Sequence, residues 1–243
     1  MNITILGCWG AYPPAGGATA GLLLRTGDSA VLIDCGSGVL AQLFHHSGMK
    51  ELDAAILSHY HNDHIADVGC LQYASLIANR TGERSELLPV YGHSKSEQFQ
   101  TLTMDKATVG HEISEGQPIE LCGMTVHFCS TEHPVYCLAM RFEKDGTSFG
   151  YTADTSYTPK LASFFEGCDL LIAESSFYEG QDAKPFGHMN AVEAGQLAQE
   201  AKVKQLVLTH FPQFGELEEM VRQASTVFNG SVELAEIGKT FSL

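Results

Sequence analysis

The sequence predicts an α/β fold in which two mixed β-sheets pack together with helices on their outer faces. Short apolar runs of strand length outnumber the helical patterns, which excludes a simple helical bundle. Hairpin signals such as Gly27-Asp28 stand among helical patterns, so antiparallel pairs and crossover connections are both expected. Three later apolar runs end in a polar residue with catalytic or ligand chemistry, as is typical of layered α/β scaffolds.

The first half of the chain alternates strand and helix patterns. Short apolar runs bounded by turn residues predict strands at 3–6, 22–24, 30–33, 54–57 and 87–91. Apolar residues at helical spacing predict helices just after Gly38, at 66–78 and at 94–102.

The second half is predicted to begin with strands and to end with helices and a strand pair. Strands are expected at 119–121, 124–129, 137–142, 148–153, 170–173 and 205–209. A helix is expected at 191–201, capped by Asn190 and Glu193, and another at 216–228. The runs 232–234 and 239–241 predict a terminal strand pair. No repeat or linker interrupts the chain, so we expect a single domain over 1–243.

Composition limits the function classes. Hydrophobic residues at 44% and charged residues at 18% are ordinary for a soluble globular protein. Lys and Arg number 14 against 29 Asp and Glu, which gives a net charge of −15. Such a charge argues against a broad electrostatic grip on nucleic acid, because that grip uses basic side chains to neutralise phosphates. A small phosphorylated substrate remains compatible, since divalent ions can supply the local positive charge.

The termini and cysteines indicate a compartment. The sequence begins without the basic and apolar regions of a signal peptide, and no run reaches the roughly 20 apolar residues of a membrane span. The seven cysteines are scattered and form no CxxC pair, which predicts buried free thiols in a reducing environment. We therefore expect a cytoplasmic protein with no membrane association.

The segment 58–64, Ser-His-Tyr-His-Asn-Asp-His, is the strongest chemical signal in the chain. Imidazole nitrogen and carboxylate oxygen together suit Zn, Mn or Fe. On an extended segment His59 and His61 face the same way and can bind one ion. Asp63 and His64 lie past the following bend and can turn toward a second ion. The alternative is a polar loop that is rich in histidine by chance.

Further motifs follow this segment in an order that resembles the metallo-β-lactamase superfamily. The ordered set is His59-x-His61-x-Asp63-His64, then His133, Asp154 and His210, with Asp34-Cys35-Gly36 upstream. The resemblance implies a four-layer αβ/βα sandwich with a dinuclear site at one edge of the sheets. It assigns one metal to His59, His61 and His133. It assigns the other to Asp63, His64 and His210, with Asp154 bridging both.

The same resemblance implies two divalent ions, with Zn favoured over Mn or Fe, that deliver a metal-bound hydroxide. Asp34 would accept a hydrogen bond from a ligand imidazole and fix its tautomer. The ligand assignments compete with simpler interpretations: Asp154 could cap a turn, and His210 could end a strand.

Two segments are most similar to the tRNase Z and phosphodiesterase branch of that superfamily. They are Phe-Gly-His-Met-Asn-Ala at 186–191 and Leu-Ile-Ala-Glu-Ser-Ser-Phe at 171–177. The resemblance implies that His188 binds a phosphoryl oxygen or protonates the leaving group, with Glu174 orienting it and Asp63 also in the catalytic set. Glu174 could instead be a buried carboxylate tied to backbone amides. Tyr157 and Phe177 are candidates for the wall of a substrate pocket.

The expected function is hydrolysis of a small or cyclic phosphodiester by a homodimer. Processing of tRNA 3′ ends is an alternative, but the long enzymes of that branch carry a basic arm, often between the residues matching His133 and Asp154. Here these two positions are only 21 apart. Hydrolysis of a lactone or thioester is the other alternative on the same fold. A di-iron redox protein is disfavoured because His61 occupies the position of a glutamate ligand, and a non-catalytic binding module is disfavoured by the complete ligand set.

Overall fold

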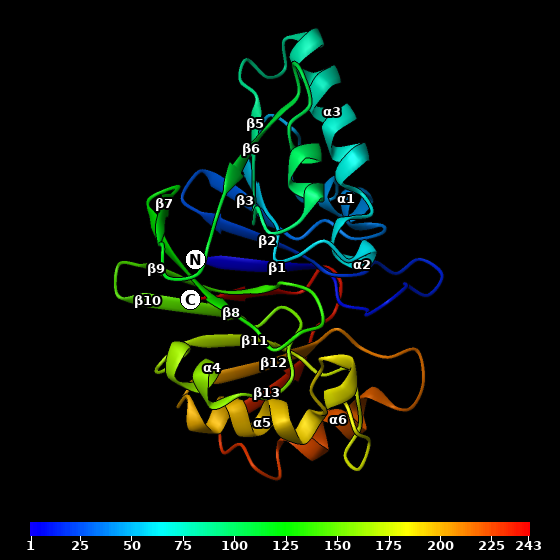
Figure 1. The fold of residues 1–243 in the computed structure, drawn as a ribbon, viewed down its shortest axis with the longest axis vertical. Helices are drawn as coiled ribbons and strands as arrows, with labels where there is room; N and C mark the ends of the chain where they lie inside the picture. The colour runs from blue at the N-terminus through cyan, green and yellow to red at the C-terminus, as the bar shows by residue number, and fades with distance from the viewer. The chain divides into compact units, whose positions relative to one another are not determined.

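The computed structural model describes residues 1–243 and divides into two compact units, each built on one mixed seven-stranded sheet (Figure 1). The N-terminal unit comprises Met1–Ile113 with Glu236–Ser242, and the C-terminal unit comprises Ser114–Ala235 with Leu243.

The sheet of the N-terminal unit has the order β14-β1-β2-β3-β4-β5-β6. Antiparallel pairs join β14, β1, β2 and β3, and parallel pairs join β3 to β6. Its strands are β1 (Asn2–Gly7), β2 (Gly21–Thr26), β3 (Ser29–Ile33), β4 (Leu52–Ile56), β5 (Leu88–Gly92), β6 (Thr108–Glu112) and β14 (Thr240–Ser242).

Helices cover this sheet through their apolar residues. The helices are α1 (Val39–Leu43), α2 (Asn62–Ile65), α3 (Val68–Thr81) and the 3-10 helix η1 (Glu97–Leu102). Buried Val39 and Leu43 of α1 and Leu71 of α3 join Leu23 and Leu32 of the sheet in one apolar core. This burial, at roughly 25 cal/mol per Å² of apolar surface, is the main force that holds helices and sheet together.

The sheet of the C-terminal unit has the order β13-β12-β11-β10-β9-β8-β7. The pairs from β7 to β10 are antiparallel and those from β10 to β13 are parallel. Its strands are β7 (Ile119–Leu121), β8 (Met124–Ser130), β9 (Leu138–Lys144), β10 (Thr147–Tyr151), β11 (Leu170–Glu174), β12 (Gln205–Thr209) and β13 (Ser231–Leu234). Every residue of β11 is buried, as expected for a parallel strand covered on both faces.

Four helical segments belong to the C-terminal unit: α4 (Pro159–Phe164), the 3-10 helix η2 (Lys184–Phe186), α5 (Ala191–Glu200) and α6 (Leu217–Ala224). Helix α5 lies against β11 and β12, and α6 lies against α5 and β13 (Figure 1). The predicted cap of α5 is confirmed, because Asn190 Oδ1 accepts from the Glu193 amide at 3.0 Å and Glu193 Oε2 accepts from the Asn190 amide at 2.9 Å.

Several features differ from the sequence-based predictions. The terminal strand pair is wrong, because β13 pairs with β12 and β14 pairs with β1, in different sheets. The helix predicted at 94–102 is a 3-10 helix confined to Glu97–Leu102. Strand β6 and helix α4 were not predicted. The sequence of β6, Thr-Val-Gly-His-Glu, lacks the apolar alternation that predicts a strand. For α4 a signal was present, because Thr158 before Pro159 is typical of the start of a helix.

The cysteines largely follow the prediction. All seven are free thiols, and the buried ones are Cys8, Cys35, Cys129, Cys137 and Cys168. Cys70 is exposed on α3, contrary to the general expectation of burial. The chain contains no helix with both the length and the apolar content that a membrane crossing requires.

Candidate metal centre

The chemically capable residues stand at the carboxyl ends of parallel strands in each unit. In the N-terminal unit Asp34 follows β3, and the segment 58–64 begins one residue after Leu57, which itself follows β4. In the C-terminal unit Glu174 ends β11 and His210 follows β12. Carboxyl ends of neighbouring parallel strands meet at one edge of a sheet, so residues far apart in sequence gather there.

The backbone turns sharply just after three strands, β3, β10 and β12. Asp34, Ala153 and His210 have φ values of 56°, 51° and 60°, in the left-handed region that L-residues rarely adopt. Each such residue costs on the order of 1–3 kcal/mol, which the surrounding structure must offset. Of these three residues, His210 is a predicted ligand, Asp34 is the predicted partner of a ligand, and Ala153 precedes the predicted ligand Asp154.

The N-terminal unit gathers the four ligands predicted from segment 58–64. His61 has extended backbone angles, φ −66° and ψ 148°, and is the N-cap of α2, so Asp63 and His64 lie in the first turn of that helix. The His59 ring centroid lies 4.8 Å from that of His61 and 4.1 Å from that of His64. His64 Nε2 and Asp63 Oδ2 are 4.0 Å apart. The segment therefore converges locally, as its residue pattern predicts.

Asp34 fixes the tautomers of two of these imidazoles. Its Oδ2 accepts from His64 Nδ1–H at 2.7 Å, which is the contact predicted for Asp34. Ser58 donates its amide to Oδ1 at 2.8 Å and its hydroxyl to Oδ2 at 2.9 Å. Because the only hydroxyl hydrogen of Ser58 is used, its Oγ accepts from His59 Nδ1–H at 3.0 Å. In the neutral form of both rings the proton therefore sits on Nδ1, and Nε2 carries the lone pair that can bind a metal.

Asp154 lies between two imidazoles of the C-terminal unit. Its Oδ1 is 3.4 Å from His210 Nε2, and its Oδ2 is 3.9 Å from His133 Nε2. Two ligands bound at about 2.1 Å to one tetrahedral ion stand about 3.4 Å apart, so each separation is close to that of a shared ion. One carboxylate that presents a different oxygen to each imidazole has the arrangement of a bridging ligand.

Hydrogen bonds set the tautomers of these two imidazoles as well. His133 Nδ1 donates to the Gly187 carbonyl at 2.9 Å. Gly187 has φ 75°, and a Cβ there would lie 2.8 Å from His133 Nδ1, so this approach requires glycine. His210 Nδ1 is 2.8 Å from Ser176 Oγ, which donates its own hydrogen to Glu174 Oε2 at 2.9 Å. In their neutral forms His133 and His210 thus also carry the proton on Nδ1 and the lone pair on Nε2.

Glu174 is buried and is held by backbone and side-chain donors together. His188 Nδ1 donates to its Oε1 at 2.8 Å, and three backbone amides, those of Thr155, Ser176 and Met189, donate to its two oxygens. Glu174 is therefore tied to backbone amides and also contacts His188, so its role in orienting that ring stays a prediction. The His188 ring centroid lies 5.3 Å from those of both His133 and His210.

The donor set fits divalent transition metals. Four imidazoles have Nδ1 engaged and Nε2 directed away from that partner, and two carboxylates, Asp63 and Asp154, supply hard oxygen donors. Ser58 and Ser176 connect the ligands to carboxylates, and neither role was predicted from the sequence. Their one available signal was their position next to predicted site residues.

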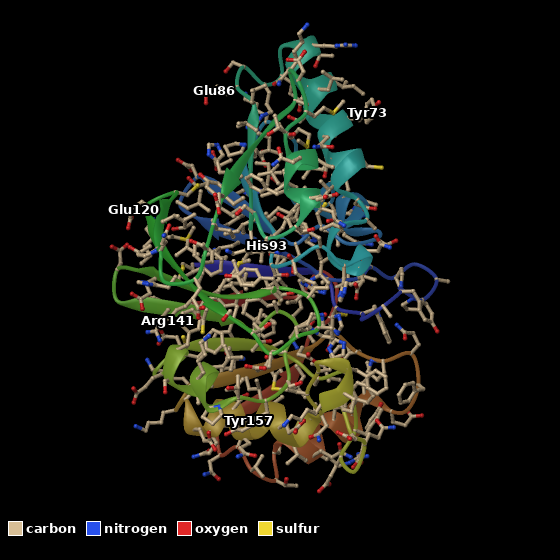
Figure 2. The ribbon with its side chains drawn as sticks, viewed as in Figure 1. Tyr73, Glu86, His93, Glu120, Arg141 and Tyr157 are labelled. Carbon is tan, nitrogen blue, oxygen red and sulfur yellow. The ribbon has the colours of Figure 1, made fainter.

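Three further side chains have defined places. Tyr157 lies over α5 (Figure 2), where its hydroxyl donates to Glu200 Oε2 at 2.6 Å. It also lines a cavity of about 400 Å³ together with Lys184. Phe177 lies beside His188, at 6.2 Å between ring centroids. His93, labelled in Figure 2, is only 3% exposed, and its ring centroid lies 4.5 Å from that of Tyr60. The Tyr60 hydroxyl donates to the His93 carbonyl at 2.7 Å, which anchors the segment between His59 and His61.

Comparison with known proteins identifies the family. Residues 29–211 match the β-lactamase superfamily domain, and the chain therefore belongs to that family. Its sequence is 45% identical over 239 residues to the probable metallo-hydrolase YhfI of Bacillus subtilis, covering 98% of each chain. The crystal structure of YhfI, a metallo-β-lactamase fold protein, matches with a TM-score of 0.97 at 44% identity, over 99% of this chain and 98% of that one.

Two more distant structures share the fold. The short form of human tRNase Z has a TM-score of 0.79 at 24% identity, over 100% of this chain and 99% of that one. A diphosphatase from the PhnP family has a TM-score of 0.80 at 20% identity, over 100% of this chain and 97% of that one. The predicted fold, two mixed sheets with helices in the metallo-β-lactamase pattern, is confirmed, and the comparisons support the predicted class of metallo-hydrolase.

Proposed function

We propose that this chain is a dinuclear metal-dependent phosphodiesterase that hydrolyses a small or cyclic phosphodiester. His59, His61 and His133 would hold one ion, and Asp63, His64 and His210 the other, with Asp154 bridging them. The support is the family's ordered ligand motif together with the preset tautomers in each unit. Zn is the favoured metal because imidazole-rich sites with few carboxylates suit it, with Mn or Fe as alternatives.

When bound, two divalent ions supply Lewis acidity and lower the pKa of a shared water. The chain's own residues prepare the ligands for that task. Asp34 and Ser58 hold His59 and His64 in the metal-binding tautomer. Asp63 is itself fixed, because its Oδ2 accepts from the Ala11 amide at 2.8 Å. Little reorganisation is then needed when ions bind.

The pairing of His188 with Glu174 is the observation that carries the phosphodiesterase proposal. Nδ1 of His188 is occupied by the carboxylate at 2.8 Å, while 18% of the side chain stays exposed. A carboxylate at Nδ1 orients the ring and stabilises the positive charge it carries when Nε2 is protonated. Such an Nε2–H can bind a phosphoryl oxygen or give its proton to the departing alkoxide. Lactone and thioester hydrolysis on the same fold does not require His188.

Processing of tRNA 3′ ends is the second candidate, supported by likeness to the short tRNase Z structure. Two observations favour a smaller substrate. The net charge of −15 opposes a long nucleic acid, and His133 and Asp154 are only 21 positions apart, which leaves no room for a long basic arm between them.

A substrate panel tests the proposal. Protein loaded separately with Zn and Mn is assayed on an activated phosphodiester, a cyclic nucleotide, an acyl lactone, a thioester and precursor tRNA. We expect turnover of the small phosphodiesters to exceed that of the other substrates. Preferred cleavage of the lactone or thioester would overturn the phosphodiesterase assignment, and preferred cleavage of precursor tRNA would replace the small substrate with RNA.

A further inference from the structure

A row of four aromatic rings leads away from His210 in the C-terminal unit. Each ring contacts the next: His210 stacks on His188 at 5.3 Å and 27°, and His188 lies 6.2 Å from Phe177. Phe177 stacks on Phe186 at 5.6 Å with only 20° between the ring planes. The row begins at a proposed metal ligand and ends at an exposed ring.

The outer end of the row is open to solvent although it is a large apolar side chain. Phe186 is 60% exposed, and one of its faces is already covered by Phe177. Single exposed apolar residues are common on protein surfaces and need no explanation by themselves. Phe186 differs because it continues a stack that contains the proposed proton donor, two ring-to-ring steps of 5.6 and 6.2 Å away.

Backbone hydrogen bonds hold the two phenylalanines in place. The Phe177 carbonyl accepts from the Ala191 amide at 3.0 Å, which ties the end of β11 to the start of α5. The Phe186 amide donates to the Ala183 carbonyl at 3.1 Å within the turn that contains η2. Glu174 accepts from both His188 and the Met189 amide, so this turn is fixed on the same carboxylate as the proposed proton donor. The stack is therefore formed before any ligand binds.

We infer that Phe186 is a stacking platform for the nucleobase of the substrate, so that the small phosphodiester is a nucleotide rather than a sugar phosphate. This inference rests on the proposed function. A flat ring with one free face binds any base through its π-face, in a way that tolerates base identity. A sugar phosphate has no such face and gains nothing from an exposed phenyl ring. Phe177, predicted as a pocket wall, supports the platform from behind.

The test compares two substrates that differ only in the base. One is adenosine 2′,3′-cyclic phosphate, and the other is methyl riboside 2,3-cyclic phosphate, which has the same ring ester and no base. We expect the metal-loaded protein to turn over both, with a KM lower for the adenosine compound. Phe186→Ala should raise the KM for the adenosine compound roughly 5- to 150-fold, the range that stacking of one base is worth, with kcat unchanged. The same variant should leave the KM of the base-free compound unchanged.

Two further variants separate stacking from folding and from apolar area. Phe186→Trp should retain the low KM because it keeps an aromatic face, whereas Phe186→Leu should resemble Phe186→Ala. Phe44→Ala is the matched control, because Phe44 is 51% exposed at the end of α1 and lies outside the row. Equal KM values for the two substrates, or a Phe186→Leu variant with the wild-type KM, would overturn the platform while leaving the phosphodiesterase intact. Failure to turn over these two compounds and the activated phosphodiester of the substrate panel would instead overturn the proposed function, and the platform with it.

Discussion

Replacing Glu174 by glutamine should destabilise the protein, because the substitution reverses the hydrogen-bonding character of a buried group. Glu174 is 1% exposed, and its two oxygens accept from His188 Nδ1, Ser176 Oγ and three backbone amides. A glutamine of the same shape puts an NH₂ where one carboxylate oxygen was. That NH₂ can only donate, so the donors that met this oxygen lose their acceptor.

The size of the loss in unfolding free energy is set by the less damaging of the two orientations that the glutamine amide can take. An NH₂ in the place of Oε1 faces His188 Nδ1 and the Thr155 amide, which lie 2.8 Å from that oxygen. His188 can change tautomer and accept, so one buried backbone amide is left without a partner. That costs roughly 1–3 kcal/mol, and the remaining hydrogen bonds lose their charge assistance. We expect a loss of about 2–4 kcal/mol in the free energy of unfolding.

Urea unfolding of the metal-free protein, in chelator, isolates this effect from metal binding. A loss of this size should also lower Tm by roughly 5–15 °C for a chain of this length. Glu200→Gln is the matched control: Glu200 lies on α5 and accepts from the exposed Tyr157 hydroxyl and Gln196, so its loss should stay within about 0.5 kcal/mol. A Glu174→Gln variant as stable as that control would refute the reasoning.

Three other expected outcomes follow from the structure. Ser176→Ala removes the hydroxyl between His210 and Glu174, so metal affinity should fall by roughly 10- to 100-fold while the fold is retained. Competition with a chelator measures this affinity, and a variant with the wild-type affinity would contradict the prediction. The hydrogen bond from Lys160 at 2.6 Å lowers the pKa of Glu115 from its ordinary 4.5, so the pair stabilises fully above pH 4.5 and loses that contribution as pH falls through the lowered pKa. Lys160→Met should therefore lower the free energy of unfolding at pH 7, by less than about 1 kcal/mol for so exposed a pair, and with it Tm. The Tm gap to wild type should narrow near pH 3; a gap that widens in acid would show the opposite sign. Burial raises the pKa of Cys8 to about 12 and that of Cys35 well above its ordinary value, so iodoacetamide at pH 8 should label exposed Cys70 first, as mass spectrometry would detect; early labelling of Cys35 would contradict its burial.

Local sequence was sufficient for the part of the site that folds locally. His59 to His64 span six residues at the end of one strand, so their convergence depends only on an extended segment and the start of α2. Asp154 and His210 were predicted as ligands from their order along the chain. The partners that fix the imidazoles were not identified, because Ser176 meets His210 and Gly187 meets His133 only after distant segments have folded together.

The fold shows the same division between local and tertiary information. Residues 232–234 and 239–241 have the pattern of a hairpin, with Gly238 between them. The chain instead places β13 parallel to β12 and β14 antiparallel to β1, and no local pattern distinguishes these pairings. The 3-10 helix η1 likewise has apolar residues at helical spacing, and it packs on β5 and β6, which lie outside the pattern that predicted it.

The most direct test of the proposed function measures metal content and phosphodiester turnover on the same preparations of wild type and His188→Gln. We predict two equivalents of Zn or Mn in both proteins, because His188 is outside the proposed ligand set. Turnover of the cyclic phosphodiester should fall at least 100-fold in the variant, as expected when a positioned proton donor is removed. A variant that keeps wild-type turnover, or a wild-type protein that holds less than one equivalent of metal, would contradict the proposal.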